Sequence, residues 1–303
     1  MISAAPFRDR VVHHALTRVL APVFEPRFTV SSFASRKGFG QHAALDRARA
    51  ACGRYRFVLK ADIRKYFPSI DHLILKQLLE RSVKCERTLA LAALIVDSSN
   101  AQEESNFYFP GDDLFTPFER RRGLPIGNQT SQFLSNVYLN PLDHFVLRDL
   151  QPALYLRYVD DFVLFGEDAR ALTEMRAAIA DFLAGLRLTL HEGKSRVYRC
   201  HDGVTFLGWR LFPGRTRLPR PQVVRARRRL HKLARLFHRG ELGFSDVSAR
   251  INAWLGHVKW GETAGLRRRL LSRFILNAAE RGRNCAARRL LEQQSGERPR
   301  LEP

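Results

Sequence analysis

Two adjacent acidic residues, Asp160 and Asp161, lie between the apolar runs 154–159 and 162–165. Two apolar runs joined by a polar pair predict a β-hairpin with both carboxylates at its tip. Crowding two like charges is costly unless a cation neutralises them, and no lysine adjoins the pair. Ligands that are all oxygens favour Mg²⁺, although an aspartate pair alone is also common turn chemistry.

A third carboxylate, Asp62, lies at the end of the apolar run YRFVLKADI (55–63) and precedes the segment KYFPSIDH. A strand here that lay beside the hairpin would bring Asp62 to Asp160 and Asp161. Three carboxylates can hold two metal ions about 3.5–4 Å apart, which activate an attacking oxygen and stabilise a leaving one. The three residues together predict phosphoryl or nucleotidyl transfer.

The charge of the chain indicates what it binds. The 303 residues carry a formal net charge of +21, and residues 217–303 hold 21 Lys and Arg against 7 Asp and Glu, a net of +14. A basic surface of this size attracts a polyanion, and nucleic acid is the leading candidate. A solvated, highly charged helical tail is the alternative.

Composition narrows the class of protein and its location. Hydrophobic residues make up 45% of the chain, which is typical of folded globular proteins. The sequence has no run of about 18 apolar residues and no signal-peptide pattern, so we expect a cytoplasmic protein with no membrane partner. Its four cysteines are widely spaced, with no CxxC pair, which argues against a zinc site.

Periodicity and turn residues predict mixed α and β elements followed by a helical C-terminal part. Asp71 is the expected N-cap of a helix that runs to about residue 82, and Thr130 or Ser131 that of a helix that runs to about residue 140. Further helices are expected at 8–22, ended by Pro22, and at 41–51, 168–185 and from 221 onward. Besides the hairpin, strands are expected at 55–63, 186–190, 196–200 and 204–211, a loop at 97–122 and a linker at 213–221.

Several segments resemble blocks of the reverse transcriptase family. DIRKYF (62–67) resembles the first catalytic block, GLPIGNQTSQ (123–132) the block that contacts template and incoming nucleotide, and YVDD (158–161) the YxDD block, the most specific of the three. HEGK (191–194) is similar to the next block and VTFLGW (204–209) to the primer-grip hairpin. The similarity extends from about Phe7 to Thr263.

This resemblance implies an α+β, right-hand polymerase fold. Fingers and palm, with an antiparallel sheet, are expected over 1–212, an α-helical thumb over 213–290 and a disordered tail over 291–303. Family members usually have residues ahead of the segment at Phe7, so we expect either truncated fingers or an unusually short member. No maturase-like extension, HNH nuclease or ribonuclease H block follows the thumb in this sequence, so intron mobility is not expected.

The resemblance also implies a set of site residues. Two Mg²⁺ ions, for which Mn²⁺ can substitute, are expected at Asp62, Ile63, Asp160 and Asp161. Lys194 is the candidate for protonating or neutralising the leaving pyrophosphate, and a solvated surface lysine is the alternative. Candidates for binding the dNTP are Arg36, Lys37, Phe67, Ile126, Gly127 and Gln132. Candidates for contacting nucleic acid are Tyr158, Gly208, Trp209, Arg225, Arg228, Arg229 and Lys232.

Two of these residues carry predictions about specificity. Phe67 lies where the family places a bulky side chain under the nucleotide sugar, so its ring is expected to exclude a ribose 2′-hydroxyl; the alternative is an aromatic anchor of the core. Ile126 replaces a polar residue of relatives that hydrogen-bonds near the nucleotide. Without that hydrogen bond the enzyme loses a check on the geometry of the incoming nucleotide, which predicts low fidelity of copying. The alternative is that Ile126 is an ordinary packing residue.

The expected reaction is RNA-directed DNA synthesis from dNTPs on a template RNA with a DNA or RNA primer. The chain resembles the reverse transcriptases of diversity-generating retroelements at the pairs IG (126–127) and SQ (131–132) and in the segment INAWLGHVKW (251–260). Those enzymes copy with errors and work with a small basic accessory protein. One alternative is a stand-alone phage-defence or retron-like reverse transcriptase. An RNA-dependent RNA polymerase is disfavoured by Phe67, and a non-catalytic RNA-binding scaffold by the three carboxylates.

Overall fold

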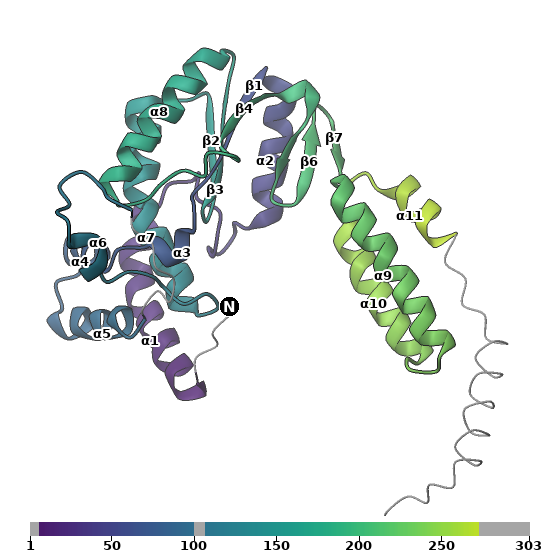
Figure 1. The fold of residues 1–303 in the computed structure, drawn as a ribbon, viewed down its shortest axis with the longest axis horizontal. Helices are drawn as coiled ribbons and strands as arrows, with labels where there is room; N and C mark the ends of the chain where they lie inside the picture. The colour runs from purple at the N-terminus through teal and green to yellow at the C-terminus, as the bar shows by residue number, and fades with distance from the viewer. Residues whose placement is uncertain (1–5, 100–106, 273–303) are drawn as a thin grey trace, which may run out of the picture. The chain divides into compact units, whose positions relative to one another are not determined.

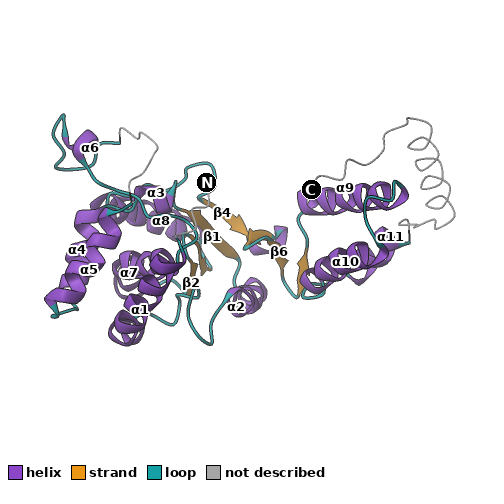
Figure 2. Ribbon diagram, turned by 90° about the horizontal axis from the view of Figure 1, so that it is seen from below, coloured by secondary structure: helices purple, strands orange, loops and turns teal. Residues whose placement is uncertain are grey.

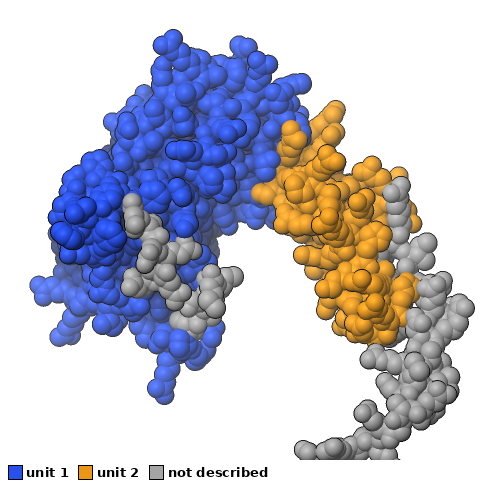
Figure 3. Space-filling view, viewed as in Figure 1, with its two compact units in different colours: residues 1–207, 211–214 blue, residues 208–210, 215–303 orange. Residues whose placement is uncertain are grey.

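The structure, a computed structural model, describes residues 6–99 and 107–272. The chain divides into two compact units, residues 1–207 with 211–214 and residues 208–210 with 215–303 (Figure 3). The predicted boundary between palm and thumb at 212–213 stays a prediction. Residues 273–290 of the predicted thumb and the predicted tail at 291–303 lie outside the described residues.

The first unit contains an antiparallel four-stranded sheet with the order β2-β3-β1-β4. Its strands are β1 (Phe57–Asp62), β2 (Leu154–Tyr158), β3 (Asp161–Gly166) and β4 (Arg196–Arg199). Helix α8 packs on one face of this sheet and α2 on the other (Figures 1 and 2). The FVLF segment of β3 (162–165) is fully buried and does not alternate with polar residues, because both of its faces are covered.

In the described part of the first unit, eight α-helices surround this sheet and its core. They are α1 (Phe7–Phe24), α2 (Gln41–Arg54), α3 (Tyr66–Ser69), α4 (His72–Glu80), α5 (Glu86–Asp97), α6 (Thr116–Glu119), α7 (Gln129–Phe145) and α8 (Ala169–Gly185). Helices α1 and α7 pack together through aromatic rings, with the Phe133 centroid 6.0 Å from those of both Phe24 and Phe28. Helix α7 is buried around most of its circumference, which makes it the central helix of this unit.

The predicted hairpin and the predicted Asp71 cap are confirmed. Strands β2 and β3 pair antiparallel, with Tyr158 opposite Asp161. The Asp71 carboxylate accepts a hydrogen bond of 3.1 Å from the Ile74 main-chain nitrogen, so it satisfies one of the free donors at the start of α4.

Two predicted helix boundaries are wrong: the end of the first helix at Pro22, and the start of α7 at a cap formed by Thr130 or Ser131. Pro22 lies inside α1, in its last turn, where it removes one main-chain hydrogen bond but does not end the helix. Helix α7 begins at Gln129 without a side-chain cap and continues past Pro141 to Phe145. Burial of α7 offsets the local cost of the proline and the missing cap.

Two predicted segments also differ from the structure. Of the expected strand 186–190, only Leu190 forms a β-bridge, an isolated one to Ile63 just after the end of β1. The expected linker 213–221 contains strand β7 (Arg215–Arg217) and the start of α9. The chain passes from the first unit to the second through β5 (Val204–Phe206), β6 (Trp209–Phe212) and β7, which form a sheet in this order.

Up to residue 272, the second unit contains the helices α9 (Arg220–His238), α10 (Phe244–Val258) and α11 (Ala264–Leu271), with α9 and α10 side by side (Figures 1 and 2). Helix α9 buries Ala226, Leu230, Leu233 and Phe237, one apolar face of an otherwise charged helix. The predicted α+β class is confirmed by this combination of an antiparallel sheet and helices. Among the described residues, no helix is long and apolar enough to cross a membrane.

Candidate active site

The structure brings Asp62, Asp160 and Asp161 to one end of the four-stranded sheet. Strands β1 and β3 pair antiparallel in a register that sets Asp62 directly opposite Asp161. Asp160 lies in the tight turn between β2 and β3, and its carbonyl oxygen accepts a hydrogen bond of 3.3 Å from the Ile63 main-chain nitrogen. Residues about 100 positions apart in the sequence therefore meet, and Ile63 lies directly beside them.

Burial makes this cluster electrostatically unfavourable on its own. It raises the pKa of Asp161 to about 7; Lys60 partly opposes the shift, and repulsion from Asp62 and Asp160 adds to it. The Lys60 ammonium is 3.8 Å from one carboxylate oxygen of Asp161, while the other, Oδ1, is buried without a hydrogen-bond partner. Burial also raises the pKa of Asp160. An unpartnered buried carboxylate oxygen in an all-oxygen cluster fits a hard divalent cation such as Mg²⁺.

Lys194 forms an ion pair with Asp62, the third carboxylate of the cluster. Its ammonium is 3.2 and 3.4 Å from the two oxygens of Asp62, and its side chain is 54% exposed. The turn that carries Lys194 is fixed to β1, because the His191 main-chain nitrogen donates to the Asp62 carbonyl at 2.8 Å. As these side chains stand, no three metal-binding groups of the described residues converge on one point.

Phe67 and the turn at 123–128 lie together beside this cluster. Lys65, with φ 45°, turns the chain sharply after β1 and starts α3. Phe67 is half-buried, and its carbonyl oxygen accepts a 2.9 Å hydrogen bond from the Leu124 main-chain nitrogen. Ile126 is 43% exposed, so it is not a core packing residue. Gly127 has φ 121°, a conformation that favours glycine.

Arg36 was expected to bind the triphosphate, but its position in the structure contradicts that prediction. Its side chain is 7% exposed, and its guanidinium donates to the Glu25 carboxylate at 2.9 Å and to carbonyls of its own loop at 2.6 and 3.0 Å. With most of its donors used, Arg36 anchors the loop. The neighbouring Lys37 is exposed. Ser35 donates to the side chain of Gln132 at 3.1 Å, which joins this loop to α7.

The expected nucleic-acid contact of Trp209 is also corrected. The Trp209 ring is fully buried and packs against Trp260 and His257, with centroid distances of 5.1 and 5.6 Å, so it cannot stack on a base. Gly208 has φ 81°, and its carbonyl accepts from Gln222 at 2.8 Å. Tyr158 is half-buried at the end of β2, opposite Asp161.

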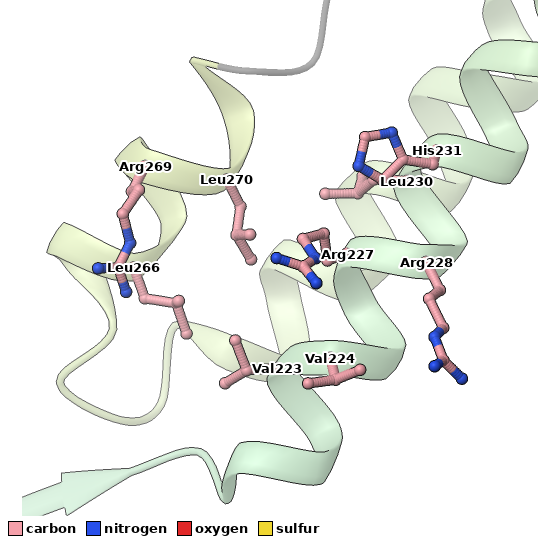
Figure 4. Close-up of a pocket in the computed structure, with 9 residues that line it drawn as sticks. All are labelled: Val223, Val224, Arg227, Arg228, Leu230, His231, Leu266, Arg269 and Leu270. Atoms are coloured by element: carbon pink, nitrogen blue, oxygen red, sulfur yellow. The ribbon is translucent and has the colours of Figure 1, made fainter.

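The four predicted thumb contacts are all exposed on α9: Arg225, Arg228, Arg229 and Lys232. Arg228 borders a cavity of about 660 Å³ between α9 and α11, whose wall is formed mainly by apolar and arginine side chains (Figure 4). Arg229 and Lys232 border a second groove, between α9 and α10.

Sequence reasoning missed Arg157, which is fully buried in β2 three residues before Asp160 and forms an ion pair with the fully buried Asp143. One signal could have found it. An arginine inside the apolar run YLRYV has to be paired if the run is a buried strand.

Comparisons with known proteins found similarities in sequence and in structure. The chain is 26% identical over 255 residues to Protein YkfC of Escherichia coli (strain K12), covering 72% of this chain and 64% of that protein. It is 28% identical over 142 residues to the group II intron-encoded protein LtrA of Lactococcus lactis subsp. cremoris, covering 47% of this chain and 22% of that protein. Among solved structures, an apo telomerase from Candida tropicalis truncated from its C-terminal domain matches with a TM-score of 0.47 and 14% identity, covering 69% of this chain and 44% of that one.

The family comparison covers most of the first unit. The chain spans less than two thirds of the length of either relative, so the expectation about intron mobility stays a prediction. The model of the family described as reverse transcriptase (RNA-dependent DNA polymerase) matches residues 1–211, which contain every strand of the four-stranded sheet and all three clustered aspartates. This match confirms the expected right-hand polymerase class, and the chain belongs to the reverse transcriptase family.

Proposed function

We propose that the protein is an RNA-directed DNA polymerase that adds dNTPs to a primer on an RNA template. The observation that carries this proposal is the β1–β3 register, which sets Asp62 opposite Asp161 and beside Asp160. The primer 3′-hydroxyl forms a bond to the α-phosphorus of the dNTP, and the bond from that phosphorus to pyrophosphate breaks. Two Mg²⁺ ions, when bound by the three aspartates, would activate the hydroxyl and stabilise the leaving group.

The chain's own residues have distinct parts in this proposal. Asp62, Asp160 and Asp161, with Ile63 next to them, provide the oxygens for the metal ions. Lys194 forms an ion pair with Asp62, and its ammonium would neutralise the developing charge on pyrophosphate. Its half-exposed position supports that role, because a flexible lysine at the edge of the site can follow the leaving group.

The second unit supports the proposal through its charge. Arg225, Arg228, Arg229 and Lys232 lie on one exposed helix, where they can follow the phosphates of an RNA–DNA hybrid. Such contacts depend on phosphate charge and duplex shape rather than base sequence, and they weaken as salt rises.

A primer-extension assay tests the function. Purified protein, an RNA template with an annealed DNA primer, dNTPs and Mg²⁺ should give extended DNA, and the Asp160→Ala variant should give none above background. A wild-type protein that binds the primed template but never extends it, in Mg²⁺ or Mn²⁺, would support the RNA-binding scaffold instead.

At a finer level, we propose error-prone cDNA synthesis of the kind found in diversity-generating retroelements, with a small basic accessory protein as partner. The exposed Ile126 and the glycine conformation at Gly127 support this proposal, because an apolar side chain there offers no hydrogen bond to the incoming nucleotide. Similarity to the intron-encoded protein LtrA favours a second candidate, reverse transcription of an intron RNA. A template and variable repeat pair in the neighbouring DNA would support the first, and a flanking intron the second.

Replacing Ile126 with Gln is expected to raise copying fidelity by about ten- to a hundredfold, since one positioned hydrogen bond contributes about 1–3 kcal/mol of discrimination. Sequencing of cDNA made by both proteins on one RNA template measures the error rate. Ile126→Val is the control, because it keeps an apolar side chain and should keep the wild-type error spectrum. Equal error spectra for wild type and Ile126→Gln would end the hypothesis.

A further inference from the structure

An arginine that no part of the proposed reaction uses lies buried beneath the aspartate turn. Arg157 is in the middle of β2, and its side chain has no solvent exposure. A buried guanidinium must be paired, and here the carboxylate of Asp143 in α7 is its partner. The pair is bidentate, with Nε and one terminal nitrogen each 2.6 Å from a different oxygen of Asp143.

Every remaining hydrogen of the Arg157 guanidinium has an acceptor. One terminal nitrogen donates to the Asn136 side chain at 3.2 Å and to the Val159 carbonyl at 3.0 Å, and the other donates to the Ser32 hydroxyl at 3.0 Å. All five donors of the guanidinium are therefore used, in a geometry that a lysine could not reproduce. The acceptors come from α7, from the loop before α2 and from the turn itself.

The partners of Arg157 are held in turn. Asp143 also accepts from the Tyr155 hydroxyl at 2.8 Å, and Asn136 donates to the Ala34 carbonyl at 2.8 Å. Tyr155 is buried in β2, and both Asn136 and Asp143 are buried in α7. The guanidinium thus has a single allowed position, fixed by two elements that belong to the core.

The bond to Val159 connects this network to the reactive carboxylates. Val159 has φ 59°, a left-handed conformation that a β-branched residue rarely adopts without support from its surroundings. Asp160 follows it directly, and Asp161 follows Asp160 at the start of β3. The direction of the Val159 carbonyl therefore fixes the path of the chain into both aspartates, and Arg157 fixes the direction of that carbonyl.

We infer that Arg157 is a positioning residue for the turn that carries Asp160 and Asp161, with Asp143 and Asn136 orienting its guanidinium. The chemical consequence rests on the proposed function, whereas the consequence for binding a divalent cation does not. A buried ion pair is commonly no more stabilising than a packed apolar pair, so stability alone gives little reason for this one. An apolar pair could not replace the hydrogen bond that Arg157 donates to the Val159 carbonyl in the strained turn.

The test compares wild type with Arg157→Met/Asp143→Leu, which removes both buried charges together and leaves none unpaired. We expect a folded protein that melts below wild type, because the buried Tyr155 hydroxyl and Asn136 side-chain oxygen lose their hydrogen-bond partners. Its affinity for Mn²⁺, measured by electron paramagnetic resonance of the free ion, should fall about ten- to a hundredfold. In primer extension, kcat should fall by a similar factor while KM for the dNTP changes little.

Two further variants complete the design. Arg157→Lys keeps the charge beside Asp143 but loses the fork geometry, so its Mn²⁺ affinity should fall as well; this variant decides if the double variant does not fold. Arg187→Met breaks a 2.7 Å ion pair with the buried Asp71 and serves as the control, with lower stability and unchanged Mn²⁺ affinity. Wild-type Mn²⁺ affinity in folded Arg157 variants would overturn the inference. A wild type that binds Mn²⁺ but does not polymerise would overturn only the proposed function.

Discussion

Replacing Asp161 with Asn is expected to abolish polymerase activity and yet make the metal-free protein more stable above pH 7. Activity should fall by about three orders of magnitude or more, because a metal ligand contributes several kcal/mol to stabilising the transition state. The stability gain follows from the pKa of Asp161, which burial raises to about 7. A buried carboxylate with a raised pKa destabilises the fold wherever it is ionised.

The pH window of this effect follows from the direction of the shift. Between about pH 4 and pH 7 the folded protein binds more protons at Asp161 than the unfolded chain, so wild-type stability falls as the pH rises. Above pH 7 the penalty is complete, at about 2–4 kcal/mol. Asparagine cannot ionise, so Asp161→Asn should melt about 5 °C or more above wild type at pH 8 and close to wild type at pH 4.

Thermal melts in EDTA, with and without added Mg²⁺, measure this trade between stability and activity. Mg²⁺ should stabilise wild type and leave Asp161→Asn almost unchanged, since it binds only the intact cluster. Asp181→Asn, on the exposed side of α8, is the matched control and should change neither stability nor activity. Identical melting temperatures for wild type and Asp161→Asn at pH 8 would show that the Asp161 carboxylate is already neutralised.

Replacing Phe67 with Ala is expected to admit ribonucleotides, with the preference for dNTPs over NTPs falling by about ten- to a hundredfold. Phe67 lies at the first turn after β1, five residues beyond Asp62, and is joined through its carbonyl to the segment that carries Ile126. The expected reason is that its half-buried ring fills the space a 2′-hydroxyl would need, which alanine would leave open.

Single-nucleotide incorporation kinetics with dNTPs and NTPs measure the effect as a ratio, which separates it from any general loss of stability. Phe57→Ala makes the same substitution at the first residue of β1, the end of that strand away from Asp62, and should keep the wild-type ratio. Phe67→Tyr keeps the ring and should do the same. Undiminished rejection of ribonucleotides by Phe67→Ala would instead assign the ring to core packing.

The parts of the fold that were predictable from sequence depend on local chemistry. The hairpin follows from two apolar runs around an aspartate pair, and the start of α4 from the capping side chain of Asp71. Pro22 gave a wrong helix end, and α7 continues past Pro141, because tertiary packing of α1 and α7 outweighs the local penalty of a proline. Strand β7 was missed because three residues among prolines and arginines give no periodic signal.

The features of the candidate site also divide into those that could be predicted from the sequence and those that could not. The convergence of Asp62 with Asp161 could be predicted, because one strand end and one hairpin tip suffice to describe it. The burial of Arg36 and Trp209 could not, since their basic and aromatic character suits a binding surface as well as an interior. Arg157 depends on partners 14, 21 and 125 residues away, which no local pattern reveals.

The order of the strands in the four-stranded sheet affects how the site responds to partial unfolding on heating. Strands β1 and β3, which supply Asp62 and Asp161, are the two inner strands, with β2 and β4 at the margins. Sheets open from their margins, where fewer hydrogen bonds hold each strand. Partial unfolding that begins at β4 would release the Lys194 turn first and leave the two facing aspartates in register, so the catalytic centre would be among the last places in this unit to come apart.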